Sequence, residues 1–284
     1  MIDAIITSIT DIIINIFPLD CLTPMFMRRA MLGILLIAPF AAFSGIHIVN
    51  SQMSFFSDAI GHSAFAGVAL GLIFSFPIDV SMPVVALIVG ILVMELRQKT
   101  KLSTDTVIGI IFSAIVAFGL AVVSKNRAAA RNINMFLYGD ILTIGNFEIV
   151  YLFILLIILF IFQIFSWNRM LHIAINEQIA TVHRIPIRVY QFIFTCLLSL
   201  VVIVCVRAVG VLLVTAILIV PAAIARNIAR NSSQLFYVTL VASYISCVAG
   251  LIISAQDWAQ IPAGASIVLT ACLLFAISHV FRHK

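Results

Sequence analysis

An aspartate and a histidine stand four residues apart in the apolar stretch 54–76, which reads SFFSDAIGHSAFAGVALGLIFSF. In an α-helix this spacing places Asp58 and His62 on the same face, one turn apart. A carboxylate oxygen beside an imidazole nitrogen is half of a binding site for a divalent first-row metal ion. Zinc prefers about four ligands and manganese about six, so water, backbone carbonyls or a second protomer must complete the shell.

The pair lies in a segment predicted to cross a membrane. A spanning helix needs roughly 20 apolar residues, and residues 54–76 meet that length. A buried carboxylate in a spanning helix costs about 2.5–3.5 kcal/mol on insertion scales, so it usually has a function. The sequence leaves a structural alternative open, in which a neutral His62 is hydrogen-bonded to Asp58 as a polar pair inside a helix bundle.

Small residues line the neighbouring face of the same segment. A stripe with one small residue per turn lets a second helix approach closely in a membrane. We therefore expect an internal, tightly packed helix that presents its Asp–His face to a cavity. The stripe consists of Ala59, Ser63, Gly67 and Gly71. A second stripe predicts equally tight packing of the segment 104–124, and it consists of Gly109, Ser113, Ala117 and Ala121.

The composition is that of a protein with many membrane spans. Of the 284 residues, 63% are hydrophobic and 10% are charged, and the mean hydropathy is +1.23. Soluble domains are about 25% charged. The net charge of +5 comes from basic residues scattered over short loops, which does not indicate nucleic-acid binding. The five cysteines include no CxxC motif and predict no disulfide framework.

The hydrophobic pattern predicts an all-α fold, a polytopic transmembrane helical bundle of eight or nine spans. Isoleucines with helical spacing predict an interfacial amphipathic helix at residues 1–18, which ends at Pro18. The break at Arg207 is too short for an ordinary loop, so a broken or partial helix is expected there, and Pro221 predicts a further break. The predicted spans are 25–49, 54–76, 78–96, 104–124, 147–166, 187–206, 208–226, 234–255 and 262–281.

The longest polar connection, residues 167–190, is predicted to lie in the cytoplasm. Basic residues concentrate on that side of a membrane, and this orientation places ten of the sixteen Lys and Arg residues inside. A short helix is predicted within the connection, with Asn176 as its N-cap and Glu177 in its first turn. It is either a docking site for a partner or a loop helix without one. Its residues are Asn176, Glu177, Gln178, Ile179, Ala180, Thr181 and Val182.

Three blocks of sequence carry a family resemblance. The first is MSFFSDAIGHSAFAGVALGL at 53–72. The second is STDTVIGIIFSAIVAFGLAVVS at 103–124, followed by FLYGDILTI at 136–144. The third is VGVLLVTAILIVPAAIAR at 209–226, followed by IPAGASIVLTACLLFAIS at 261–278. In this order and at this spacing, they resemble the membrane subunit of bacterial zinc and manganese ABC importers, with zinc-uptake permeases as the nearest kind.

The resemblance implies a metal-ion ABC permease domain over residues 25–284, in the bacterial cytoplasmic (inner) membrane. Such a permease is not an enzyme, because two separate ATPase subunits use the ATP; this sequence indeed has no GxxxxGK[ST] motif. The resemblance further implies an extracytoplasmic metal-binding protein as donor, a second permease copy in a homodimer, and no permanently bound cofactor. Asp58 and His62 would coordinate the transported metal, and 176–182 would be the coupling helix. The family usually ends this helix with glycine where this chain has Arg184, so a differently shaped end is expected.

Other polar residues are weaker candidates for a metal pathway. His47 precedes the Asp–His segment and would receive metal on the inner side. Glu95 would serve metal exit, or would form a surface pair with Lys99 four residues on. Asp140 would serve metal entry, or would be a turn residue. Asp105 is expected to cap the segment that follows it.

The predicted function is the permease of an ATP-driven importer of divalent metal, with zinc ahead of manganese. Histidine favours zinc, whereas carboxylate with water favours manganese. The alternative is a proton-driven secondary metal transporter in which Asp58 and His62 form the proton relay. An intramembrane metalloenzyme is not supported, because no HExxH motif occurs.

Overall fold

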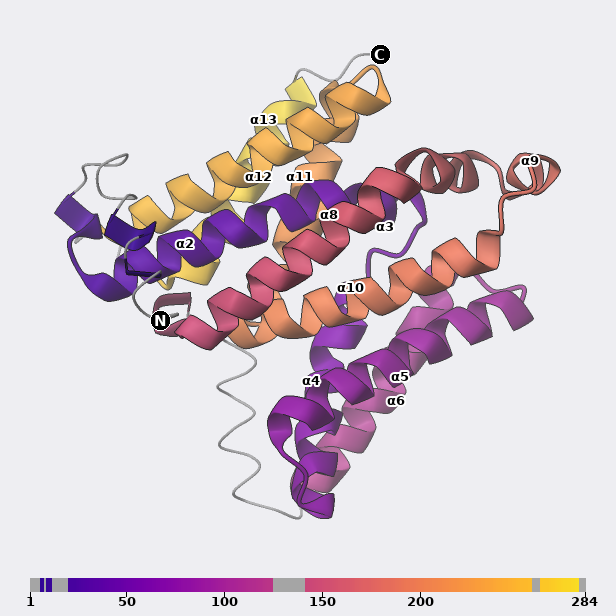
Figure 1. Ribbon diagram of the computed structural model, residues 1–284, viewed down its shortest axis with the longest axis horizontal. Helices are drawn as coiled ribbons and strands as arrows, with labels where there is room; N and C mark the ends of the chain where they lie inside the picture. The colour runs from indigo at the N-terminus through magenta and orange to yellow at the C-terminus, as the bar shows by residue number, and fades with distance from the viewer. Residues whose placement is uncertain (1–5, 8, 12–19, 125–140, 257–260, 281–284) are drawn as a thin grey trace. The chain divides into compact units, whose positions relative to one another are not determined.

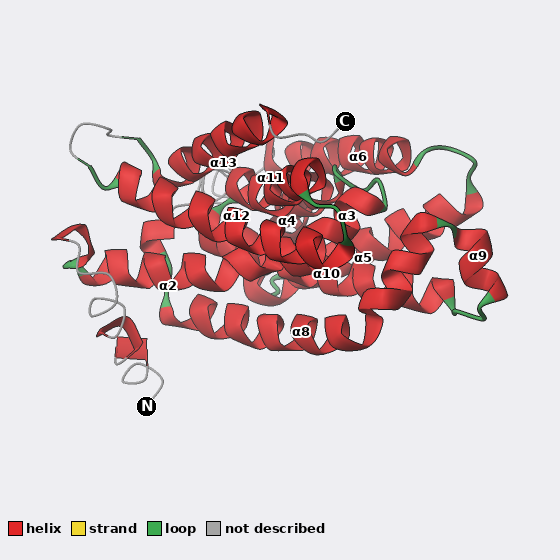
Figure 2. Ribbon diagram, turned by 90° about the horizontal axis from the view of Figure 1, so that it is seen from above, coloured by secondary structure: helices red, strands yellow, loops and turns green. Residues whose placement is uncertain are grey.

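The structure, a computed structural model, describes residues 6–7, 9–11, 20–124, 141–256 and 261–280. Within these ranges the regular secondary structure is entirely helical and no strand occurs (Figure 2). The predicted all-α fold is therefore confirmed. Most of the predicted amphipathic helix at 1–18, and Asp140, lie outside the described residues.

Eight helical segments among the described residues are long and apolar enough to cross a membrane, in agreement with the eight or nine predicted. The first, Met25–Asn50, joins α2 (Met25–Phe40), the π-helical turn η2 (Ala41–Gly45) and α3 (Ile46–Asn50). Helix α4 (Phe56–Phe74) has 19 residues and is not among the eight. The other helices are α5 (Ile78–Lys99), α6 (Thr104–Ser124), α8 (Asn146–Ile175), α9 (Glu177–Val182), α10 (Ile187–Val209), α11 (Val211–Ile228), α12 (Ser232–Ser254) and α13 (Ala263–Val280).

The chain divides into two compact units. Unit 1 comprises Met1–Ile46, Tyr138–Leu156 and Arg207–Lys284. Unit 2 comprises His47–Leu137 and Ile157–Val206. Helices α8 and α10 each contribute residues to both units.

In unit 1, helices α11, α12 and α13 pack against one another, and α2 with η2 packs against α12 (Figure 1). Glycines stand where backbones approach most closely, as is usual between helices in membranes. A Cβ atom added to Gly250 of α12 would overlap the Ile267 main chain of α13. A Cβ atom added to Gly45 of η2 would overlap the carbonyl oxygen of Leu218 in α11.

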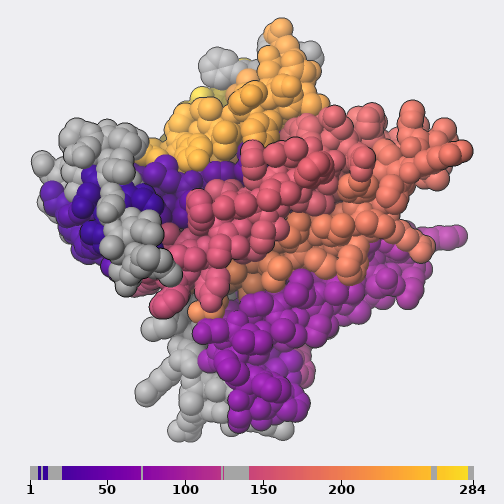
Figure 3. Space-filling view, viewed as in Figure 1, coloured from indigo at the N-terminus to yellow at the C-terminus, as the bar shows by residue number. Residues whose placement is uncertain are grey.

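In unit 2, α4 packs against both α5 and α6 (Figure 1). The purple part of the chain, which includes α4 and α5, forms one filled region in the space-filling view (Figure 3). The predicted small-residue stripe of α4 faces this packing. A Cβ atom added to Gly67 would lie 2.8 Å from Met82 Cα, and one added to Gly71 would lie 2.6 Å from Ser81 Oγ, both in α5. The prediction of an internal, closely packed helix is confirmed.

The second predicted stripe is wrong, because α6 packs through a different face. A Cβ atom added to Gly109 would meet nothing within 4 Å, and Ser113 is exposed, with its hydroxyl donating to its own helix. The face that contacts α4 carries Gly119 instead, where an added Cβ atom would lie 3.2 Å from Phe65 Cβ.

The break predicted between the spans 187–206 and 208–226 is present, but it lies at Gly210, three residues after Arg207. Helix α10 continues through Arg207, whose guanidinium lies 3.9 Å from the Glu148 carboxylate and in the last turn, where the helix dipole favours a cation. The chain turns instead at Gly210, which has a φ of 87°. Helix α11 then runs continuously through Pro221.

Candidate metal site and coupling helix

Helix α4 begins directly after a tight turn. Gln52 has a φ of 53°, in the left-handed region, and the Met53 carbonyl oxygen accepts the Phe56 N–H at 3.0 Å. This turn fixes where α4 starts, and it places Asp58 in the first turn of the helix and His62 one turn further along.

Asp58 and His62 therefore lie on one face of α4, as their spacing predicts. Both side chains are partly exposed. The His62 ring meets two phenylalanine rings edge to face, Phe65 at 5.3 Å and Phe112 of α6 at 5.1 Å. Over the described part of the chain, neither Asp58 nor His62 takes part in a hydrogen bond or an ion pair. The structural alternative, a hydrogen-bonded pair, is not formed, and both groups are open to a ligand.

No third protein ligand accompanies this pair in the described residues. They contain no group of three or more His, Cys, Asp or Glu side chains that could hold a metal ion. A site built on Asp58 and His62 thus needs ligands from water, backbone or another chain. An incomplete set suits a site that must release its ion as well as bind it.

His47 belongs to a separate cluster in unit 2. Its side chain is 1% exposed, and its ring lies edge to face with Trp167 at 5.3 Å and Phe194 at 5.6 Å. The Nε2 atoms of His47 and Gln163 are 2.7 Å apart, with Gln163 as donor when His47 carries its proton on Nδ1. Sequence reasoning missed Gln163, although a glutamine inside an apolar span was a visible signal. His47 is thus not brought into contact with the Asp–His pair.

The remaining pathway candidates are also dispersed. Glu95 is exposed and accepts from Lys99 Nζ at 3.1 Å, which confirms the predicted surface pair. Ser103, not Asp105, caps α6, because the Ser103 hydroxyl accepts the Thr106 N–H at 3.2 Å.

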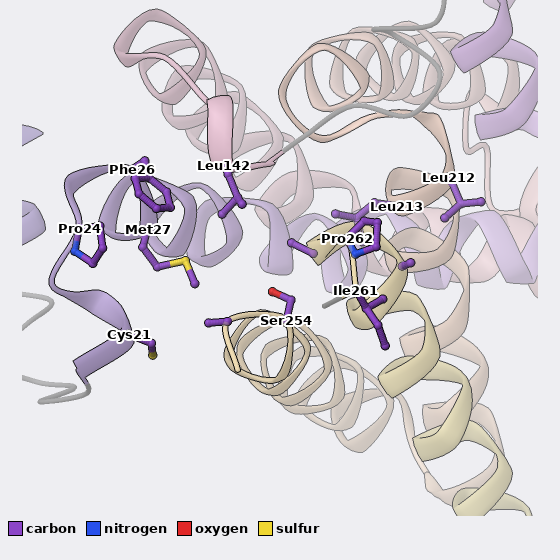
Figure 4. Close-up of a pocket in the computed structure, with 14 residues that line it drawn as sticks. Cys21, Pro24, Phe26, Met27, Leu142, Leu212, Leu213, Ser254, Ile261 and Pro262 are labelled. Carbon is purple, nitrogen blue, oxygen red and sulfur yellow. The ribbon is translucent and has the colours of Figure 1, made fainter. Parts of the chain in front are cut away.

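A cavity of about 910 Å³ opens within unit 1, at the starts of α2, α11 and α13 and the end of α12 (Figure 4). The described residues of its wall are mainly apolar and include no carboxylate or imidazole group. The residues that line it include Phe26, Met27, Leu142, Leu213, Ser254 and Pro262.

The predicted short helix is present as α9. The Asn176 side-chain oxygen accepts the N–H groups of Gln178 at 2.8 Å and Ile179 at 3.3 Å, so the predicted N-cap is confirmed. Such a cap contributes about 0.5–2 kcal/mol to a helix. The cap makes α9 a defined element despite its length of 6 residues.

Because this chain has Arg184 where the family usually has glycine, the sequence predicted a differently shaped end for α9. The end nevertheless has the conformation that a glycine usually gives. Arg184 has a φ of 55°, the left-handed conformation that a glycine usually supplies after a helix. The Ile185 N–H then donates to the Ala180 carbonyl at 3.1 Å, and the Arg184 N–H donates to the Thr181 carbonyl at 2.9 Å. This is the Schellman arrangement, formed with an arginine at the strained position.

One face of α9 and its approach is apolar and exposed. Ile179 and Val182 are 51% and 81% exposed, and their spacing of three places them on one face of α9. Ile175, the last residue of α8, is 79% exposed directly before the cap. Ala180, on the other side, is buried. An exposed apolar face on a polar loop is the mark of a protein-docking surface.

The chain matches a protein family, and it is similar to several known proteins. The ABC 3 transport family matches residues 24–282. The chain is 32% identical over 240 residues to the high-affinity zinc uptake system membrane protein ZnuB of Haemophilus influenzae, covering 84% of this chain and 91% of that protein. It is 26% identical over 264 residues to the manganese transport system membrane protein MntC of Halalkalibacterium halodurans, covering 91% and 88%. The structure of PsaBC from Streptococcus pneumoniae in complex with Fab matches with a TM-score of 0.76 at 26% identity, covering 90% and 91%.

Over its described residues the chain is all-helical, with eight apolar helical segments long enough to span a membrane and a short helix on a polar loop, which is the architecture of a membrane-embedded transport subunit. The chain belongs to the ABC 3 transport family. It is a multi-pass permease subunit of the bacterial inner membrane and not an enzyme, and ATP hydrolysis belongs to a separate chain. The predicted family is confirmed.

Proposed function

We propose that this permease imports a divalent transition metal, with Zn²⁺ as the first candidate and Mn²⁺ as the second. Asp58 and His62 of α4 are proposed to bind the metal ion transiently. The observation that carries the proposal is the state of this pair. A carboxylate and an imidazole lie one turn apart on a helix packed against its neighbours, partly exposed and without a hydrogen-bond partner among the described residues. Polar groups in such a position are costly unless a ligand uses them.

Coupling to ATP is proposed to act through α9 and its cap, residues 176–182. The exposed apolar side chains of Ile179 and Val182 provide the surface on which an ATPase subunit docks. Two ATPase subunits, an extracytoplasmic metal-binding protein and a second permease copy would complete the importer. ATP binding by the partner would then change the side of the membrane from which Asp58 and His62 are reached.

The choice of metal follows from the ligand types. An imidazole suits zinc, and a carboxylate completed by water suits manganese. Relatives named for each metal are similar to this chain: two named for zinc are 32% and 26% identical to it, and two named for manganese are 26% and 27% identical. We therefore place zinc first.

The test is uptake of radioactive Zn²⁺ and Mn²⁺, in competition, by vesicles that contain the permease with its ATPase chain. We expect ATP-dependent uptake that the variants Asp58→Asn and His62→Gln each lower at least about 10- to 100-fold, the loss seen when the hydrogen-bond partners of metal ligands are replaced. The matched control is His279→Gln, because His279 is an exposed histidine at the end of another span. Uptake at the wild-type rate in both site variants would overturn the proposal.

The same vesicles separate the second candidate, a proton-driven transporter with Asp58 and His62 as the relay. Its ion flux would stop when a protonophore collapses the proton gradient, and it would continue without ATP. Membership of an ABC family favours the ATP-driven mechanism.

A further inference from the structure

Arg97, at the cytoplasmic end predicted for α5, contacts two other elements of unit 2. Its Nη2 atom lies 3.6 Å from Glu177 Oε1, at the start of α9. Its Nη1 atom donates to the Met53 sulfur at 3.9 Å, in the turn before α4. A guanidinium group can hold both partners because its donors point in several fixed directions, whereas an ammonium group is a single point charge.

The Glu177 carboxylate is held from a second side as well. Gln191 of α10 donates from Nε2 to the same Oε1 atom at 3.0 Å. The first residue of α9 is thus fastened to α5 and to α10 by side chains, next to the N-cap that fastens it to α8. A displacement of α9 would therefore change the contacts of Glu177 with Arg97 and Gln191.

Met53, the second partner of Arg97, connects it to the start of α4. Its side chain is 4% exposed, and its carbonyl oxygen accepts the Phe56 N–H at the start of α4. The preceding residue, Gln52, is in the left-handed region. Asp58 follows Met53 by only five residues, so a shift of this turn moves the start of the helix that carries the proposed metal ligands.

The contacts of Arg97 with Glu177 and Met53, called the bridge below, lie beside a pocket. A mainly polar pocket of about 300 Å³ is lined by Arg97 and Glu177, together with Gln52, Thr104, Asn176 and Gln191. Glu177 is 56% exposed, so its ion pair adds little to stability. The arrangement is suited to exchanging partners during a conformational change rather than to locking the fold.

We propose that Arg97 is a positioning residue that relays the position of α9 to the start of α4. Through Met53 it links the ATPase-facing helix to the turn that sets Asp58 and His62. This inference rests on the proposed function for its role in transport, and on the contacts of Arg97 with Glu177 and Met53 for the link itself.

The link is tested without transport, by hydrogen exchange of the permease in lipid nanodiscs. Glu177→Gln alters only one side of the bridge, yet it should raise the exchange rate of the backbone amides of residues 50–57 about two- to fivefold, the range expected from losing one exposed ion pair. Arg97→Gln should do the same. Lys99→Gln is the matched control, because Lys99 carries the same charge at the same helix end but pairs with Glu95 of its own helix. An unchanged rate at 50–57 in both bridge variants would overturn the link.

The role in transport is tested by the amount of Zn²⁺ moved per ATP hydrolysed in vesicles. Arg97→Gln and Glu177→Gln should lower this ratio about two- to fivefold while ATP hydrolysis continues, and the exchanged pair Arg97→Glu with Glu177→Arg should restore part of it. If Arg97 and Glu177 had a purely structural role, their variants would assemble less well with the ATPase chain, but the amount of Zn²⁺ moved per ATP hydrolysed would be unchanged. A normal ratio in every bridge variant overturns the relay, whereas absence of ATP-dependent uptake in the wild type overturns the proposed function instead.

Discussion

The Tyr244 hydroxyl of α12 donates a hydrogen bond to the Leu35 carbonyl oxygen of α2, at a distance of 3.3 Å. Leu35 is four residues before Pro39, which stands inside α2 and has no N–H to offer that carbonyl. In a membrane, a freed backbone group must find another partner within the protein. Tyr244 supplies it, so a residue of α12 compensates for a proline of α2.

Tyr244→Phe should therefore destabilise unit 1 by about 1 kcal/mol, the value of a hydrogen bond between helices in a membrane. The reason is that the Leu35 carbonyl would lose its donor while remaining inside the packed unit. Thermal unfolding in detergent can be followed with a thiol-reactive dye, since Cys205 and Cys247 are buried. The three other cysteines would first be replaced.

Two further variants make this measurement decisive. Tyr237→Phe is the matched control, because Tyr237 is 65% exposed on the same helix and should be insensitive to loss of its hydroxyl. Pro39→Ala restores the missing N–H, so Tyr244→Phe should cost less in that background. Equal costs with and without Pro39 would contradict the proposed compensation.

Arg184→Gly should stabilise the α9 region by about 0.5–1 kcal/mol. The left-handed conformation costs a side-chain-bearing residue about 1–2 kcal/mol, which glycine avoids, and part of the gain is lost to the greater freedom of glycine in the unfolded chain. Slower hydrogen exchange of residues 177–183 is the expected signal. Arg184→Ala removes the same charge but keeps the strain, so a comparable gain in that variant would refute this explanation.

The features of the chain that depend on local spacing could be predicted from the sequence. The Asp58–His62 face, the Asn176 cap and the contact of Gly67 with α5 follow from helix periodicity or from a few neighbouring residues. The stripe that begins at Gly109 shows the limit of such reasoning. Periodicity defines a face, but only the packed structure decides that α6 turns Gly119 towards α4 instead.

Contacts between residues distant in the sequence could not be predicted. Arg97 and Glu177 are 80 positions apart, and His47 and Gln163 are 116 apart, so no local pattern connects them. The predicted break at Arg207 was misplaced by three residues for a related reason. A charge inside an apolar run suggests a helix end, but a carboxylate from Glu148 and the last-turn position make the charge acceptable within α10.

The metal stoichiometry of the purified permease is a third prediction. Asp58 and His62 supply two ligands per chain, and no three-residue ligand group occurs in the described residues. If two copies complete a four-ligand zinc site, titration should end near one Zn²⁺ per two chains, and Asp58→Asn should abolish that binding. Native mass spectrometry or calorimetry gives the ratio. Tight binding of one Zn²⁺ per chain would instead mean that each chain completes its own site with backbone or water.

The two glycines Gly45 and Gly109 should respond to alanine with opposite signs. Both lie in helical segments, where alanine is intrinsically favoured over glycine by about 0.5–1 kcal/mol. At Gly45 the added methyl group would overlap the Leu218 carbonyl oxygen, so the main chains of η2 and α11 must separate, at a cost of about 1–3 kcal/mol. At Gly109 the methyl group would meet no atom within 4 Å, so Gly109→Ala should be neutral or stabilising. The same cysteine-exposure assay measures both variants. Destabilisation of equal size at the two sites would show that glycine flexibility, and not the close approach of η2 to α11, is what these helical segments require.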